Sequence, residues 1–172
     1  LGINFDSPEA LRFADENQEF ISYHAILGSV ELAKERGVYS TFKNSKWDRG
    51  IMPVDTLALL EAERGSQIPV PKTGKMDWNF VRQQVKMFGM RNSNTMAIAP
   101  TATISNIAGS SPCIEAYYKN IYVKSNMSGE FTMVNDYLVA DLKKLGLWNT
   151  DMLAEIKQAE GSVQNIPGIP DY

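Results

Sequence analysis

The spacing of apolar residues along this chain predicts a series of helices, most of which end at a glycine. Ser7-Pro8-Glu9 combines a capping residue, a proline at the first helical position and an acid in the first turn. A long helix is therefore expected from this point to Lys34-Glu35-Arg36-Gly37. Its predicted apolar stripe consists of Phe20, Ile21, Ala25, Leu27, Gly28 and Leu32.

Four further helices are predicted with separate start and stop signals. Their starts are Pro53-Val54-Asp55, Asp77-Trp78, Asn135 or Asp136, and Thr150 or Asp151, and their stops are Gly65, Gly89, Gly146 and Gly161. In the first of these, Leu57, Ala58 and Leu60 are expected to face inward. Residues 39–50 are polar and residues 66–75 are rich in turn residues, so both segments are predicted to be surface loops.

Three short strands complete the predicted elements. Thr95 to Ala99 forms an apolar run typical of a buried strand, while Ile121 to Val123 and Glu130 to Val134 flank a Ser128-Gly129 turn. Many helices with few strands favour part of an α/β barrel, because a closed barrel of this kind needs about eight strands.

The segment after the first predicted strand has the pattern of a phosphate-binding loop. Pro100 ends the strand, small residues at 101–103 let an anion approach the backbone, and Thr103 or Ser105 could cap a following helix. Capping alone also explains the hydroxyl groups, so a purely structural turn is the alternative. The chain contains neither the P-loop pattern nor the Gly-x-Gly-x-x-Gly pattern of common nucleotide sites.

Length and composition predict one structural unit across residues 1–172, with an ordinary globular balance of 44% hydrophobic and 22% charged residues. The net charge of −3 and the scattered basic residues argue against nucleic-acid binding. The sequence holds no run of 18 apolar residues and no signal peptide at its start. It begins without methionine and ends in what resembles a connection, so a piece of a longer polypeptide is expected.

Single cysteine and histidine residues limit the possible chemistry. Cys113 allows no internal disulfide and fits a reducing compartment, so a cytoplasmic location is expected. His24 has no second histidine with which to share a metal, and it is interpreted as a satisfied or half-buried helix residue. No metal site is predicted.

Several segments together resemble the large (α) subunit of class I ribonucleotide reductase in order and spacing. They are Met90-Arg91-Asn92-Ser93, Ala99-Pro100-Thr101-Ala102-Thr103-Ile104, Cys113-Ile114-Glu115, Asn120-Ile121-Tyr122, Ser128-Gly129-Glu130-Phe131 and Leu145-Gly146-Leu147-Trp148. The resemblance covers essentially the whole chain. It implies a helix-rich section from the later part of a ten-stranded α/β barrel.

This resemblance also implies a substrate site. The phosphate contacts would be Thr101, Ala102, Thr103, Ile104 and Ser105, with Pro100 shaping the loop that holds the diphosphate of a ribonucleotide. Ile104 replaces a hydroxyl residue of relatives and can offer only its N–H.

The residues of radical chemistry are expected elsewhere in the parent chain. Cys113 is interpreted as a small packing residue, and Tyr117-Tyr118 as packing or turn aromatics rather than the radical-relay pair. This section would hold no catalytic residue, no metal and no cofactor. The implied partners are a ribonucleoside diphosphate, the rest of the large subunit and a metal-containing small subunit that supplies the radical, with ATP and dNTP effectors. The alternatives are a cobalamin-dependent reductase fragment and a non-catalytic helical interaction module.

Overall fold

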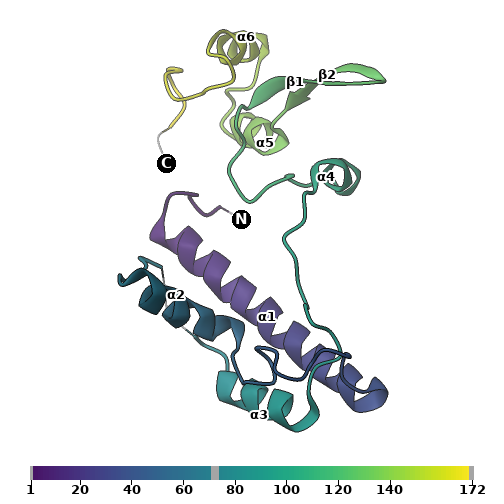
Figure 1. Cartoon of the computed structure of the whole chain (residues 1–172). Helices are drawn as coiled ribbons and strands as arrows, with labels where there is room; N and C mark the ends of the chain where they lie inside the picture. The colour runs from purple at the N-terminus through teal and green to yellow at the C-terminus, as the bar shows by residue number, and fades with distance from the viewer. Residues whose placement is uncertain (1, 71–73, 171–172) are drawn as a thin grey trace. The chain divides into compact units, whose positions relative to one another are not determined.

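The protein is represented by a computed structural model that describes residues 2–70 and 74–170 (Figure 1). Its elements are α1 (Pro8–Arg36), the 3₁₀ helix η1 (Pro53–Asp55), α2 (Thr56–Arg64), α3 (Trp78–Phe88), α4 (Ala102–Ala108), β1 (Ile121–Asn126), β2 (Gly129–Val134), α5 (Asp136–Lys144) and α6 (Thr150–Gln158). The chain divides into two compact units, unit 1 (Leu1–Ala99) and unit 2 (Pro100–Tyr172), and each is described by itself. Whether residues 1–172 fold as one structural unit stays a prediction.

Helix α1 begins and ends where its sequence signals predict. The Ser7 hydroxyl accepts a hydrogen bond from the Ala10 N–H at 3.1 Å, which satisfies one of the free donors of the first turn. At the other end, Gly37 has φ 75° and its N–H donates to the Ala33 carbonyl at 2.8 Å. Within the described residues, none of the helices is both long enough and apolar enough to cross a membrane.

The buried face of α1 differs from the predicted stripe. Its buried residues are Ser22, Ile26, Ser29, Val30 and Ala33, whereas Phe20 and Ile21 are 56% and 53% exposed. Leu32 and Gly28 are exposed as well. Hydrophobic periodicity passes over this row of residues because two of them are serines, which are polar. A buried serine is nevertheless tolerated when its hydroxyl is hydrogen-bonded. The predicted stripe was therefore wrong for Phe20, Ile21, Gly28 and Leu32, whereas Ala25 is half-buried and Leu27 packs against the core.

The core of unit 1 joins α1 and α3 to the loop segments between them and directly after α3. Its fully buried residues are Ile26, Val30, Met52, Val81, Val85 and Met90. Tyr39, Phe42 and Trp47 pack against this core, so the predicted surface loop of residues 39–50 also contributes aromatic packing. The prediction used the average polarity of the segment, and the polar residues beside these three aromatic residues dominated that average.

Helix α2 starts with the predicted Pro53-Val54-Asp55 signal, which forms η1 before the α-helix begins. Gly65 ends α2 in the left-handed conformation, with φ 65° and ψ 20°. Leu57 and Leu60 are half-buried, but Ala58 is exposed, which corrects its predicted inward orientation. The predicted loop 66–75 is described only outside residues 71–73, and its described part contains neither helix nor strand.

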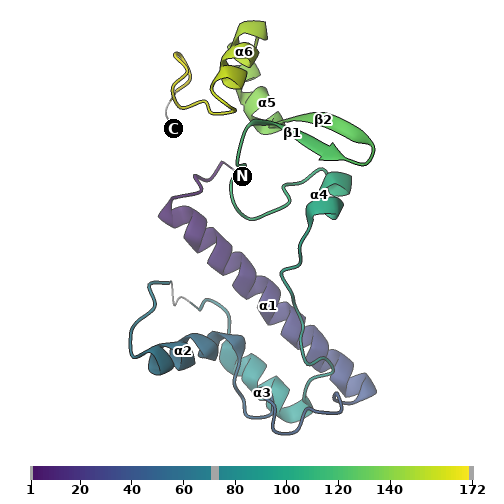
Figure 2. The ribbon, with the colours of Figure 1, turned by 45° about the horizontal axis from the view of Figure 1, so that its top comes forward.

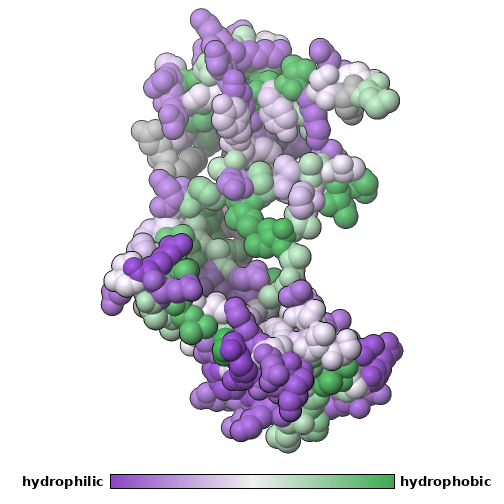
Figure 3. Space-filling model, in the orientation of Figure 1, coloured by the Kyte–Doolittle hydropathy of each residue, from purple (hydrophilic) through white to green (hydrophobic). Residues whose placement is uncertain are grey.

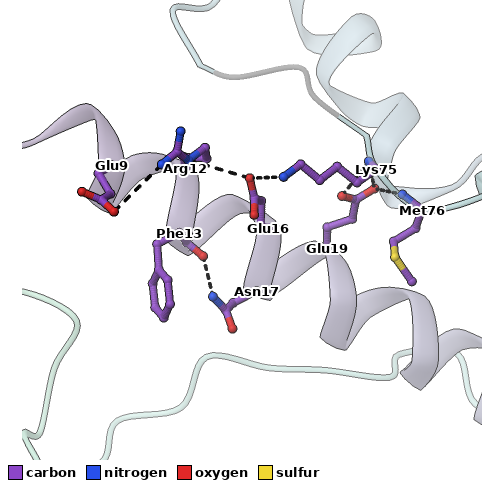
Figure 4. Close-up of polar contacts among 8 residues, drawn as sticks. All are labelled: Glu9, Arg12, Phe13, Glu16, Asn17, Glu19, Lys75 and Met76. Atoms are coloured by element: carbon purple, nitrogen blue, oxygen red, sulfur yellow. Dashed lines mark hydrogen bonds and ion pairs between the residues drawn. The ribbon is translucent and has the colours of Figure 1, made fainter. Parts of the chain in front are cut away.

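One carboxylate on α1 holds the segment that leads into α3 (Figure 4). Glu19 Oε1 accepts hydrogen bonds from the Met76 N–H at 3.1 Å and from the Trp78 indole N–H at 2.8 Å. The Lys75 N–H also donates to this carboxylate, at 2.9 Å to Oε2. Although partial burial acts in the opposite direction, these hydrogen bonds hold the pKa of Glu19 below its ordinary value.

A second polar cluster connects α3 with η1. Arg82 donates to Asp55 through Nη1 at 2.6 Å and through Nη2 at 3.1 Å, and it also donates to the Gly50 carbonyl. Asp55 Oδ2 accepts the Met52 N–H at 2.7 Å, so the same carboxylate completes the start of η1. The Arg82 hydrogen bonds hold the pKa of Asp55 below its ordinary value.

The lowered pKa of Asp55 predicts a loss of stability in acid. A carboxyl whose pKa is lower in the folded state than in the unfolded state stabilises the folded protein when it is ionised. This stabilisation is fully present above the pKa of the unfolded state, about 3.9, and it is lost as the pH falls through the pKa of the folded state. Asp55→Asn is expected to cost about 1 kcal/mol at pH 7, discounted for partial exposure, and to flatten the decline below pH 5. Urea denaturation at pH 7 and pH 3 measures both effects. In the matched control Asp141→Asn, which removes an exposed ion pair with Lys144, the acid decline should stay unchanged. An equally flattened decline there would contradict the assignment to Asp55.

Unit 2 contains the predicted hairpin and two helices that pack together (Figure 2). Strands β1 and β2 are antiparallel, with Ile121 opposite Val134 and Asn126 opposite Gly129. Asn135 caps α5, one of the two predicted caps, and α6 begins at the predicted Thr150, with Asn149 as its cap. The buried core is made of Leu142, Met152, Ile156 and Ile166.

A small amide network connects the ends of the hairpin with the turn after α6. The Asn120 N–H and its side-chain amide both donate to the Gly161 carbonyl, at 3.1 and 3.0 Å. Asn135 donates from its backbone to the Asn120 carbonyl at 2.8 Å and from its side chain to Asn120 Oδ1 at 2.9 Å. Three segments that are distant in sequence are thereby fixed at one point.

The predicted strand Thr95 to Ala99 is not formed. The structure leaves these residues irregular, and Ile98 is 83% exposed. A strand needs a hydrogen-bonding neighbour, and the sheet in the described part of the chain has only two strands, β1 and β2. The described residues alone therefore do not form a ten-stranded barrel. Figure 3 shows apolar side chains at the surface of both units.

Candidate phosphate-binding loop

The predicted loop residues lie at the start of unit 2, where an irregular segment enters α4 (Figure 1). Thr101 is the capping residue, with φ −119° and ψ 20°, and its side chain makes no capping hydrogen bond. The Thr101 hydroxyl instead donates to the Pro112 carbonyl at 2.6 Å, which ties the beginning of α4 to the segment after it. The prediction that Thr103 or Ser105 caps this helix was wrong, because both lie inside it.

Ser105 has a structural environment. It is only 3% exposed, its N–H donates to the Thr101 carbonyl at 2.9 Å and its hydroxyl donates to the Ala102 carbonyl at 3.2 Å. The Ser110 N–H donates to the Ser105 carbonyl at 3.0 Å, and Gly109 ends the helix with φ 65°. Ser105 thus makes hydrogen bonds with residues at both ends of the short helix.

The groups available to a ligand belong to the first turn of α4. The N–H groups of a first helical turn have no acceptor within the helix, and here they belong to Ala102, Thr103 and Ile104. All three residues are exposed, and Pro100 before them is exposed too. Exposed first-turn N–H groups and the Thr103 hydroxyl can bind an oxyanion, with the helix dipole adding to the attraction.

Ile104 contributes no polar side-chain group to this turn. Its side chain is 61% exposed, and Ile107 one turn later is 82% exposed. Where relatives have a hydroxyl residue, Ile104 can therefore offer a ligand only its backbone N–H. An apolar surface lies beside the candidate anion site.

A lysine that the sequence reasoning did not select also contacts α4. Lys124 on β1 donates from Nζ to Asn106 Oδ1 at 3.0 Å. This brings a positive charge to the helix that follows the loop. No signal in the sequence connects a helix position and a strand position that lie 18 residues apart, so only the folded arrangement identifies Lys124.

Other residues singled out in the sequence lie outside this turn. Cys113 is exposed, which corrects its interpretation as a packing residue. Tyr118 is 93% exposed and does not pack, whereas Tyr117 is 39% exposed and its pKa is raised mainly by partial burial.

His24 lies on α1 in unit 1, on the exposed side of the helix. Its ring contacts Phe20 in a tilted arrangement and Tyr23 edge-to-face, with centroid distances of 4.5 and 5.2 Å. The predicted place of His24 in a helix is confirmed, but the half-buried alternative was wrong. Among the residues that the structure describes, no three His, Cys, Asp or Glu side chains are grouped to hold a metal ion.

Comparison with known proteins identifies the family to which this chain is similar. The family profile described as "Ribonucleotide reductase, barrel domain" matches residues 1–172. The chain is 51% identical over 173 residues to the "Ribonucleoside-diphosphate reductase subunit alpha" of Chlamydia pneumoniae, covering 100% of this chain and 17% of that protein.

Two further relatives show the same relationship. The subunit of the same name from Chlamydia trachomatis serovar D is 52% identical over 100% of this chain and 16% of its own length. The "Ribonucleoside-diphosphate reductase large subunit" of Arabidopsis thaliana is 37% identical over 99% of this chain and 20% of its own length. The chain thus spans between 16% and 20% of the length of these curated relatives.

Proposed function

This chain belongs to the ribonucleotide reductase barrel-domain family, and on that basis we propose that it is the diphosphate-binding section of a ribonucleoside-diphosphate reductase large subunit. The match over the whole chain carries the proposal. The exposed first turn of α4, which follows Pro100 directly, supports a role in binding phosphate. The complete enzyme would convert ribonucleoside diphosphates to deoxyribonucleoside diphosphates in the cytoplasm.

Each of the six candidate residues has a separate part in this proposal. Ala102, Thr103 and Ile104 offer N–H groups, and Thr103 adds a hydroxyl. Pro100 restricts the entry to the helix, because its ring fixes φ. Thr101 and Ser105 make internal hydrogen bonds that hold the turn in shape, so their side chains support the site.

The proposed contribution of this section is positional. Holding the diphosphate places the ribose at a fixed point relative to the reacting groups, and such positioning can lower a barrier by several kcal/mol. The radical and redox cysteines belong to other parts of the parent chain in this proposal. In this proposal the section contributes a binding loop whose reactive partners come from other parts of the parent chain.

The partners proposed from the family are the rest of the large subunit and a separate small subunit. A radical generated at the metal centre of the small subunit would start the reaction, and ATP or dNTP effectors would act outside this section. The names of the relatives, "subunit alpha" and "large subunit", favour this two-subunit class over the cobalamin-dependent alternative.

Thr103→Ala in the complete reductase tests the proposed loop. Loss of one hydroxyl contact to a charged diphosphate is expected to raise KM about tenfold while kcat changes less than about twofold. Steady-state kinetics with a ribonucleoside diphosphate measures the two constants. Thr132→Ala, which makes the same change at an exposed position on β2, is the control and should leave both unchanged. An unchanged KM for Thr103→Ala would refute the assignment of this hydroxyl.

A further inference from the structure

Helix α1 has a second surface on the side opposite its buried face. This outer face consists of six exposed residues, Phe13, Asn17, Phe20, Ile21, His24 and Gly28. The helical period of 3.6 residues places them on one side of α1, over about 22 Å of its length. None of the six is charged at pH 7 when histidine is neutral.

The charged residues in the first half of α1 lie on other sides of the helix. Figure 4 shows Phe13 and Asn17 projecting away from the side chains of Arg12 and Glu16. Arg12 pairs with Glu16, and the Asn17 side-chain amide donates to the Phe13 carbonyl at 2.7 Å, back onto the helix itself. An uncharged strip beside ion pairs has the composition of an interface core with a polar rim.

The middle of the outer face is the most apolar part. Phe20 and Ile21 are 56% and 53% exposed, and the His24 ring lies against Phe20 with a centroid distance of 4.5 Å. Single exposed apolar side chains are ordinary on a protein surface, but a continuous apolar strip marks a site of interaction. Because α1 already buries its other side in the core of unit 1, the outer face is available to a second element.

Gly28 is an independent sign that something packs closely against this face. A glycine in a helix interior is destabilising by about 1 kcal/mol relative to alanine. Among the described residues, no atom beyond the adjoining helix backbone lies within 4 Å of a Cβ added at Gly28. No contact in this part of the chain therefore requires a glycine there, whereas close approach of another backbone would.

The size of the relatives indicates where the missing element comes from. This chain spans 16% to 20% of the three relatives described above, so about four fifths of such a subunit lies outside the matched section. A segment of the same polypeptide has an effective concentration on the order of millimolar, so it reaches the face ahead of a separate molecule.

We propose that the outer face of α1 is covered by an apolar segment of the large-subunit polypeptide outside residues 1–172, with its closest approach at Gly28. This inference rests on the proposed function, because it takes the chain as a section of that subunit. An uncharged segment fits the face, since a charged side chain buried there would find no opposite charge among its six residues.

Photo-crosslinking in the complete large subunit tests this occupant. With p-benzoylphenylalanine in place of Ile21, irradiation should link the probe to a peptide of the same polypeptide outside residues 1–172. Proteolysis and mass spectrometry identify that peptide. The same probe in place of Arg12, an exposed residue on another side of α1, is the control and should form no such link.

Substitutions at Gly28 give a second measurement, in which the sign of the change in Tm decides. On an open helix surface, Gly28→Ala and Gly28→Leu would raise the Tm of the complete subunit, because both new residues favour a helix more than glycine does. Against a packed segment, Gly28→Leu should lower the Tm by about 5 °C and Gly28→Ala by less. Ala62→Leu at an exposed position of α2 is the control and should shift the Tm by less than about 1 °C.

The outcomes separate this inference from the proposed function. A higher Tm for both Gly28 variants would overturn the inference. A link from position 21 to residues 1–172, to a second copy, to an added small subunit or to no protein would also overturn it. If the expected link forms while Thr103→Ala leaves KM unchanged, the diphosphate assignment fails alone. If KM rises for Thr103→Ala and no link forms, the covered face fails alone.

Discussion

Gly161→Ala is expected to lower the free energy of unfolding of unit 2 by about 3 kcal/mol. Gly161 has φ +89°, which an alanine adopts only with strain. An added Cβ would lie 3.0 Å from the Ile121 carbonyl oxygen, 3.1 Å from Lys119 Cβ and 3.2 Å from the Ile121 nitrogen. These neighbours are mostly backbone and cannot move without breaking the hydrogen bonds between Asn120 and Gly161. Urea denaturation followed by hydrogen exchange in residues 100–170 measures the loss.

Gly168→Ala separates the two parts of this effect. Gly168 has nearly the same backbone angle, φ +87°, but nothing lies within 4 Å of an added Cβ. Its substitution should cost about 1 to 2 kcal/mol, from backbone strain alone. If both variants lost the same free energy of unfolding, crowding around the added Cβ would not contribute to the effect of Gly161→Ala.

Ile26→Ala is expected to cost about 3 kcal/mol in the stability of unit 1, within the range for a buried isoleucine. Ile26 is fully buried and packs in the cluster that joins α1 to α3. Truncating it leaves a cavity that the surrounding side chains fill only in part. Urea denaturation of the wild-type and variant chains measures the difference.

Ile21→Ala on the same helix is the control for Ile26→Ala. Ile21 is 53% exposed, so its truncation should cost less than about 1 kcal/mol. The pair tests which face of α1 packs inside unit 1. A larger loss for Ile21→Ala than for Ile26→Ala would favour the stripe predicted from periodicity over the face that the structure buries.

Helix boundaries could be predicted because their causes are local. Ser7 caps α1 and Asn135 caps α5 through hydrogen bonds to N–H groups two or three residues away. Gly37 and Gly65 end their helices with positive φ values that other residues adopt at a cost. Such signals lie within one turn of the residue concerned, so a single sequence contains them.

The buried face of α1 depends on contacts that are distant in sequence. Ser29 is buried because Asn92, 63 positions later, pairs with its hydroxyl. A hydrophobicity pattern cannot include a partner of this kind, and it therefore favoured the neighbouring row of apolar residues. The same limit applies to residues 95–99, whose apolar pattern indicates a strand but not the neighbour that would pair with it.

The candidate loop was predicted in position and only partly in detail. A helix follows the proline as predicted, but it begins at Ala102, earlier than a cap at Thr103 or Ser105 would place it. Thr101 and Ser105 differ, because the Thr101 hydroxyl pairs with Pro112 and the Ser105 hydroxyl with Ala102. A hydroxyl side chain can form a hydrogen bond with a ligand or with the nearby backbone, and the sequence alone does not indicate which partner it has. Phosphate binding by the loop stays a prediction.

The exposed thiol of Cys113 makes this chain convenient for spectroscopy. Because the sequence contains one cysteine, a maleimide dye or a nitroxide spin label attaches to this chain at one position. That position lies between the candidate loop and the β1–β2 hairpin. Because the Thr101 hydroxyl donates to the carbonyl of Pro112, the residue before Cys113, a label there would report whether the loop changes when a nucleotide is added.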